Sequence, residues 1–136
     1  MEEKVLQEYQ RIVNECERLS SVGIKTEDGQ ELTAVFKMAL MKTLIYIALL
    51  DDNVSEKEAE HINAALGTAL KVDDIRKFSS GDTAITANDP VDALQGFCRV
   101  LVNAVYEGKA LVSYKDVVKF VNALGVSFIA SDGRAD

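Results

Sequence analysis

The 136-residue sequence has few of the residue types that build metal centres, disulfide frameworks and catalytic sites. It contains one histidine, His61, and two cysteines, Cys16 and Cys98. Two cysteines provide no zinc-ligand spacing, and both lie among apolar residues at helical spacing, so we expect buried, reduced thiols. A lone histidine excludes an H-E-x-x-H zinc motif, and we expect His61 to lie at the surface or at its boundary.

Motifs for nucleophilic and phosphate chemistry are also missing. No G-x-S-x-G nucleophile elbow and no G-x-x-x-x-G-K-[ST] phosphate loop occurs in the sequence. We therefore predict a protein that is not an enzyme and that has no organic cofactor.

Positive charge is scarce. Fifteen basic residues stand against 22 acidic ones, which gives a net charge of -7. This balance argues against nucleic acid and anionic membrane surfaces, because both are bound through lysine and arginine. Solubility is the simplest explanation of the acidity, and a basic partner or a cation is the alternative.

Long apolar runs and targeting signals are lacking as well. The first four residues, Met1 to Lys4, do not form the basic and apolar regions of a signal peptide. The longest apolar stretch, Leu44 to Leu50, is too short to cross a bilayer. We predict a cytoplasmic protein.

The chain is rich in apolar residues at spacings of three and four, which predicts an all-α bundle of five long helices and one possible short helix. The expected long helices are 2–20, 32–50, one from 55 to Gly67 or Leu70, 90–108 and 113–130, and the short one is 73–78 with Asp73 as its N-cap. The helix 32–50 carries the widest apolar stripe, so we expect it at the centre. Residues 79–90 are expected to form the longest loop. Asp89 as N-cap, with Pro90 (the only proline) at the first helical position, predicts the next helix start.

Two further helix starts are predicted by capping boxes. Ser55 and Glu58 form an S-x-x-E pattern, in which a hydroxyl and a carboxylate bind backbone N–H groups of the first turn. Ser113 and Asp116 form the same pattern with the shorter acid.

An acidic turn occurs twice. The stretch 51–58, Asp-Asp-Asn-Val-Ser-Glu-Lys-Glu, partly returns as Ser-Asp-Gly-Arg-Ala-Asp at 131–136. Aligning Asp51 with Asp132 pairs apolar residues of the preceding helices, such as Phe36 with Val117. The pattern predicts two helix–acidic turn–helix hairpins, and the second lacks its final helix within this sequence.

These turns resemble the motif A-D-G-x-V-S-x-x-E of TerB-like (tellurite-resistance TerB) domains. Asp51, Val54, Ser55 and Glu58 match the motif, whereas Leu50 and Asp52 depart from it; the second copy keeps Asp132 and Gly133. The resemblance covers residues 32–136, with 1–31 as an N-terminal extension and the C-terminal end truncated. It implies a non-enzymatic helical module of bacteria or phages, linked to stress response and often fused to chaperone-like or ATPase proteins.

The acidic residues of the two turns are candidate ligands for a divalent cation. Oxygen ligands from Asp51, Asp52, Glu58 and Asp132 could converge if the two turns lie at one end of the bundle. The EF-hand pattern fails, since Glu56 stands where the loop glycine belongs. The alternative is that these acids cap helices and interact with the helix dipole, which contributes about 0.3–1 kcal/mol each.

Together these observations predict a non-catalytic interaction or regulatory module, the N-terminal domain of a larger bacterial stress-response, ATPase or chaperone-type protein. We expect an apolar groove along Tyr114–Ala130 that is filled by a protein partner or by self-association. The alternative function is a cation-binding, tellurite-resistance-like stress protein that uses its acidic turns.

Overall fold

The protein is all-α, as predicted. The computed structural model describes residues 3–26, 28–50, 54–79, 86 and 88–131, with side chains up to Val126. Within these residues there is no strand. The elements are α1 (Glu3–Ser21), α2 (Leu32–Leu50), α3 (Glu56–Leu66), α4 (Val72–Arg76), the single 3-10 turn η1 (Lys77–Ser79), α5 (Asn88–Tyr106) and α6 (Tyr114–Ser131).

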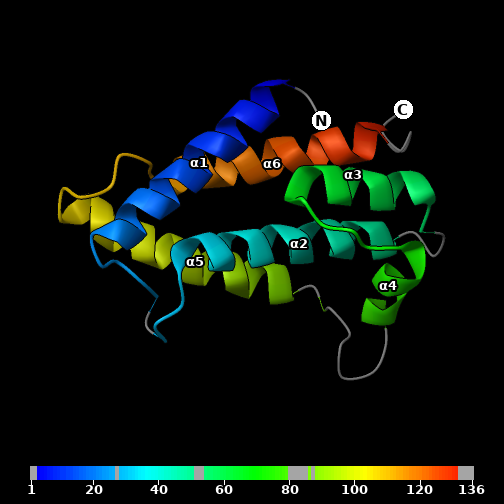
Figure 1. The fold of residues 1–136 in the computed structure, drawn as a ribbon, viewed down its shortest axis with the longest axis horizontal. Coiled ribbons are helices and arrows are strands. Elements are labelled where there is room, and N and C mark those ends of the chain that lie inside the picture. The colour runs from blue at the N-terminus through cyan, green and yellow to red at the C-terminus, as the bar shows by residue number, and fades with distance from the viewer. Residues whose placement is uncertain (1–2, 27, 51–53, 80–85, 87, 132–136) are drawn as a thin grey trace.

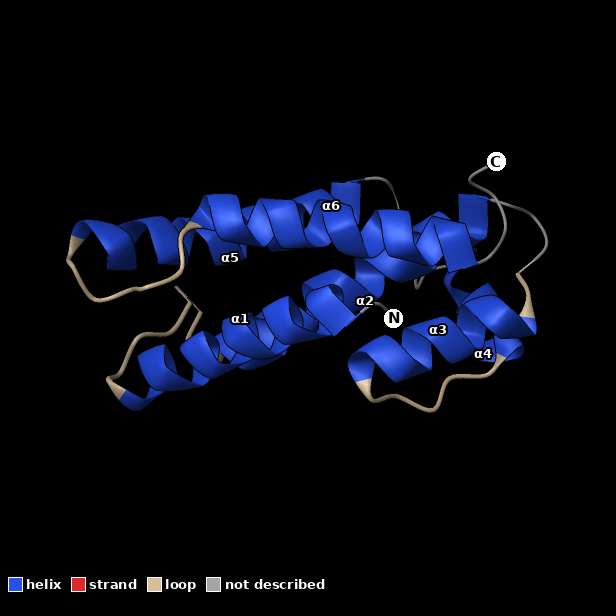
Figure 2. Ribbon diagram, turned by 90° about the horizontal axis from the view of Figure 1, so that it is seen from above, coloured by secondary structure: helices blue, strands red, loops and turns tan. Residues whose placement is uncertain are grey.

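The four long helices form two layers, and α2 belongs to the lower one in Figure 1. In Figure 1, α1 and α6 lie over α2 and α5, and α3 with α4 closes one end of the bundle. Figure 2 shows the same arrangement from above, with α1 and α6 on different sides of the bundle axis. α5 and α6 run in opposite directions, and α2 contacts each of the other five α-helices. α2 is thus the central helix that its apolar stripe predicts.

Four aromatic rings join the layers. Phe36 of α2 is fully buried, with its ring centroid 5.2 Å from Phe97 of α5 and 6.0 Å from Phe120 of α6. Tyr9 of α1 stacks on Phe36 at 6.1 Å and lies equally far from Phe120. Rings at such separations contribute beyond their buried area. One continuous core therefore includes all four long helices, and α1 supplies part of it.

α2 owes its central place to its composition. It contains two lysines and no acidic residue, and seven of its side chains are buried. Among the described helices it is the one long and apolar enough to cross a membrane by length and composition, a test that the core helix of a globular bundle also passes.

Helix starts follow the predicted boxes at two places and depart from the prediction at two others. Ser55 caps α3 together with Glu58, and Ser113 with Asp116 does the same for α6. The N-cap of α4 is Lys71 rather than Asp73, because the carboxylate of Asp74 accepts the Lys71 backbone N–H at 2.8 Å.

Asp89 is not an N-cap either. α5 begins at Asn88, and the Asp89 carboxylate accepts the backbone N–H of Thr86 at 2.6 Å from inside the first turn. The Thr86 hydroxyl donates to the same carboxylate at 3.1 Å, and the Asp89 N–H donates to the Thr86 carbonyl at 3.2 Å. Both misassignments shift a boundary by one or two residues and leave the helix in place.

A candidate docking groove on α5 and α6

An apolar groove of about 410 Å³ runs between α6, α5 and the second half of α2. We call it the uncharged groove, because none of the described residues that line it is acidic or basic. Its lining residues are Thr43, Ile47, Leu94, Cys98, Val117, Val118, Val121, Asn122, Gly125 and Val126. Six of the ten come from α6, so the groove lies along the segment Tyr114–Ala130 named from the sequence.

The α5 side of the groove is a row of apolar side chains. Leu94 and Cys98 line it, and Val102 and Val105 continue the row toward the end of the helix at helical spacing. Val102 and Val105 are 45% and 42% exposed, so apolar surface extends beyond the groove itself.

The α6 side has exposed valines as well. Val118 is 57% and Val126 is 61% exposed, although both belong to the wall of the groove. Gly125 lies between them in the helix interior, and a β-carbon added there would meet only Ile47 Cδ1, at an ordinary 3.7 Å. The missing side chain leaves the backbone of α6 open to close approach.

Two lysines follow the same row along α6. Lys115 and Lys119 precede Asn122 and Val126 at spacings of four, three and four residues, so all four lie on one strip of the helix. Both lysines are exposed, and neither forms an ion pair with a residue that the structure describes. The outer edge of the uncharged groove is therefore basic.

The two cysteines are free thiols in different surroundings. Cys16 is buried in the core under α1, and this burial raises its pKa to about 12. Cys98 is half-buried in the wall of the uncharged groove, and burial raises its pKa as well. The prediction of buried thiols holds for Cys16, whereas Cys98 is only partly covered.

A second, larger groove of about 1070 Å³ lies between α2, α5 and the loop after α1. We call it the charged groove. Its floor includes Val35, Met38 and Val100, and Met38 is 47% exposed. Its charged residues have both signs: Lys25, Lys42, Arg99, Asp28, Glu31, Asp92 and Glu107. This mixture selects no single type of charged ligand.

The start of α6 is held to α1 by a buried carboxylate. Glu15 is 6% exposed, and it accepts the backbone N–H groups of Leu111 and, at 3.0 Å, of Val112. Arg18 donates to the same carboxylate at 2.6 Å and also to the Lys109 carbonyl. Burial raises the pKa of Glu15, but these hydrogen bonds outweigh burial and lower it overall.

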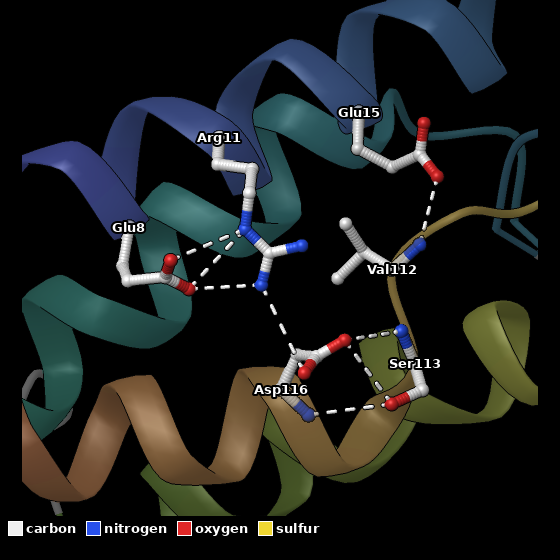
Figure 3. A network of polar contacts seen from close by, with 6 residues as sticks. All are labelled: Glu8, Arg11, Glu15, Val112, Ser113 and Asp116. Atoms are coloured by element: carbon white, nitrogen blue, oxygen red, sulfur yellow. Dashed lines mark hydrogen bonds and ion pairs between the residues drawn. The ribbon is translucent and has the colours of Figure 1, made fainter.

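Arg11 adds a second polar contact between the same elements. Figure 3 shows its guanidinium between Glu8, 2.8 Å away on α1, and Asp116, 3.8 Å away in the first turn of α6. The Asp116 carboxylate also accepts the Ser113 N–H at 3.0 Å. We call Glu15, Arg18, Arg11 and Asp116 the α1 latch.

Of the four residues of the predicted cation site, the structure describes only Glu58. Asp51, Asp52 and Asp132 lie outside the described residues, so their relation to Glu58 is not part of this structure. Glu58 is 1% exposed, and its carboxylate accepts the Ser55 N–H at 3.1 Å as the capping box requires. Among the described residues no group of three or more acidic, histidine or cysteine side chains is arranged to hold a metal ion.

His61 lies on α3, where its side chain is half-buried. Burial is the first cause of the lowered pKa of His61, and it favours the neutral imidazole. This agrees with a histidine at the boundary between surface and core.

Two features of this region were missed at the level of sequence. The α1 latch had a signal, because Glu15 stands three residues after Ile12 and four before Leu19, in line with the buried face of α1. The contributions of Ile47, Leu94 and Cys98 to the groove had none, because helical spacing does not say which helices become neighbours.

Comparison with known proteins provides no relative. The chain matches no protein-family model, no curated protein and no solved structure.

Proposed function

We propose that this chain is a non-catalytic helical interaction or regulatory module, and that the uncharged groove is where it binds a partner. The groove is the observation that carries the proposal. Solvent-exposed apolar surface is costly unless something covers it, and a groove between helices accepts the apolar face of another helix.

The TerB-like resemblance of residues 51–58 is part of the same proposal. It suggests a bacterial stress-response setting in which a small helical module works beside larger ATPase or chaperone-type proteins. A cytoplasmic location fits two free thiols, because oxidising compartments favour disulfides.

Affinity capture with a matched pair of variants tests the function. Val118→Glu introduces a charge into the groove wall at a side chain that is 57% exposed. Val22→Glu introduces the same charge at a 59% exposed valine in the loop after α1, away from the groove. Wild type, Val118→Glu and Val22→Glu are immobilised, exposed to extract of the cells that produce the protein, and compared by quantitative mass spectrometry.

We expect at least one protein that wild type and Val22→Glu capture equally and that Val118→Glu captures at least about ten-fold less, the loss typical of a central interface residue. The proposed function is wrong if no captured protein depends on Val118. Circular dichroism of each bait confirms that the helical content is unchanged.

A further inference from the structure

We propose that the occupant of the uncharged groove is an acidic amphipathic helix of a partner protein, held by its apolar face in the groove and by its carboxylates at Lys115 and Lys119. The inference rests on the proposed function and specifies the chemistry of the partner. Its basis is the distribution of charge around α6.

One flank of α6 is covered by α1 of the same chain. On the flank that faces α1, the helix offers an acidic residue, Asp116, and α1 supplies the matching Arg11 at 3.8 Å. Beside that ion pair, Phe120 packs against Tyr9. This flank combines an apolar contact with a charge of opposite sign at its edge.

The opposite flank has the same composition with the sign reversed. Val118 and Val126 provide exposed apolar surface, and Lys115 and Lys119 form the edge. A partner helix that binds this flank in the way α1 binds the other flank needs an apolar stripe with glutamate or aspartate beside it. Complementary charges at such an edge select the partner and its orientation more than they add affinity.

The local charge differs from that of the whole molecule. α5, α6 and the loop between them, residues 88–131, contain four basic and four acidic residues and are neutral overall, although the chain carries a net charge of -7. In a twofold dimer both copies would present the same groove, whose described lining has no acidic side chain to pair with the lysines. An acidic helix meets them with opposite charge, so we favour it over self-association.

Two designed peptides test the proposal on the intact protein. Both are 18-residue, end-blocked amphipathic helices with an identical leucine stripe; one carries glutamate and the other lysine on the flanks. Cys98 serves as an internal reporter, since an occupant of the groove covers its thiol, whereas Cys16 is already buried. The rate of Cys98 alkylation by neutral iodoacetamide is measured against peptide concentration, together with amide chemical shifts.

We expect the glutamate peptide to protect Cys98 and to bind at least about ten-fold more tightly than the lysine peptide, since two exposed ion pairs are formed in one case and two repulsions in the other. The double variant Lys115→Glu/Lys119→Glu should abolish or invert this preference. The double variant Lys37→Glu/Lys57→Glu changes the net charge equally at two exposed lysines of α2 and α3 and should preserve it.

Equal binding of the two peptides, tighter binding of the lysine peptide, or binding of neither overturns the inference. So does a concentration-dependent dimer in analytical ultracentrifugation that protects Cys98 without peptide, because the occupant is then a second copy. The proposed function fails separately, when affinity capture finds no partner that depends on Val118. A Val118-dependent partner without peptide discrimination leaves the function standing and rejects the acidic helix.

Discussion

One flank of α6 is covered by α1 and the other borders the uncharged groove, although both belong to one helix in one bundle. On the covered flank Phe120 is 3% exposed and Asp116 faces Arg11. On the other flank Val118 is 57% exposed and the nearby lysines have no ion-pair partner among the described residues. The difference teaches that exposed apolar surface on this helix is local and one-sided.

The α1 latch holds α1 against the covered flank of α6 through polar contacts. Glu15 accepts two backbone N–H groups in the loop before α6, and that of the buried residue Val112 would otherwise lack a partner. The loop therefore keeps α1 in register with α6. No comparable polar contact crosses the uncharged groove within the described part of the chain, where the lining has no charged side chain.

The largest difference between the flanks should appear in stability. Phe120→Ala removes a buried ring between Tyr9 and Phe36 and should lower the free energy of unfolding by about 3–5 kcal/mol. Val118→Ala removes an exposed side chain and should change it by less than about 0.5 kcal/mol. Urea denaturation followed by circular dichroism measures both, and similar losses would contradict the distinction between a closed and an open flank.

The latch is the next target. Glu15→Gln retains the size of the side chain but removes its charge, which should lower the free energy of unfolding by about 2 kcal/mol at pH 7. Glu8→Gln, at an exposed glutamate of the same helix, should cost less than about 0.5 kcal/mol.

The effect of Glu15 should depend on pH. Because its pKa is lowered in the folded protein, the carboxylate stabilises the fold above its ordinary pKa, and this contribution is lost as pH falls below about 4.5 toward the lowered value. The difference between wild type and Glu15→Gln should therefore shrink as pH falls below about 4.5, as measured by denaturation at each pH. A constant difference would show that the charge of Glu15 is not what matters.

The start of α6 should contribute less. Ser113→Ala removes the hydroxyl of its capping box and should lower the free energy of unfolding by about 1 kcal/mol, as should Ser55→Ala at the box of α3. Only Ser113→Ala should speed hydrogen exchange in α1, since the latch rests on the first turn of α6. Equal hydrogen exchange of α1 in the two variants would show that the capping box of α6 does not support the α1 latch.

The smallest expected effect is a gain. Gly125→Ala on the open flank and Gly96→Ala in the charged groove both place a methyl group in an α-helix without a clash, and each should add about 0.5–1 kcal/mol of stability. Only Gly125→Ala narrows the uncharged groove, so only it should weaken binding of the glutamate peptide. Binding measured with Gly96→Ala is the control, and unchanged binding with Gly125→Ala would show that close approach at residue 125 is not needed.

The local sequence pattern predicted the helices of this protein better than it predicted the contacts between them. Apolar spacing identified all the long helices, and hydroxyl–acid pairs at Ser55 and Ser113 identified two helix starts, because both signals arise within one or two turns. The N-cap predicted at Asp73 lies two residues earlier, at Lys71, and α5 already begins at Asn88, one residue before the predicted N-cap Asp89, since neighbouring acids compete for the same backbone N–H groups.

The walls of the uncharged groove also differ in how far the sequence predicts them. The expectation of a groove along Tyr114–Ala130 came from the missing final helix of the second hairpin, and six residues of α6 line the groove that the structure contains. Its α2 and α5 walls, with Ile47 and Cys98, depend on which helices pack together. The Glu15 latch joins segments far apart in the sequence, and only its place in the buried line of α1 hinted at it.

That separation has a consequence for how the chain is made. Glu15 and Val112 are 97 residues apart, so at about 5–20 residues per second α1 leaves the ribosome roughly ten seconds before its latch can form. α2 emerges much sooner and contacts α1 directly. We therefore expect an α1–α2 hairpin to shelter the apolar face of α1 during synthesis, and α6 to complete the latch as one of the last steps of folding.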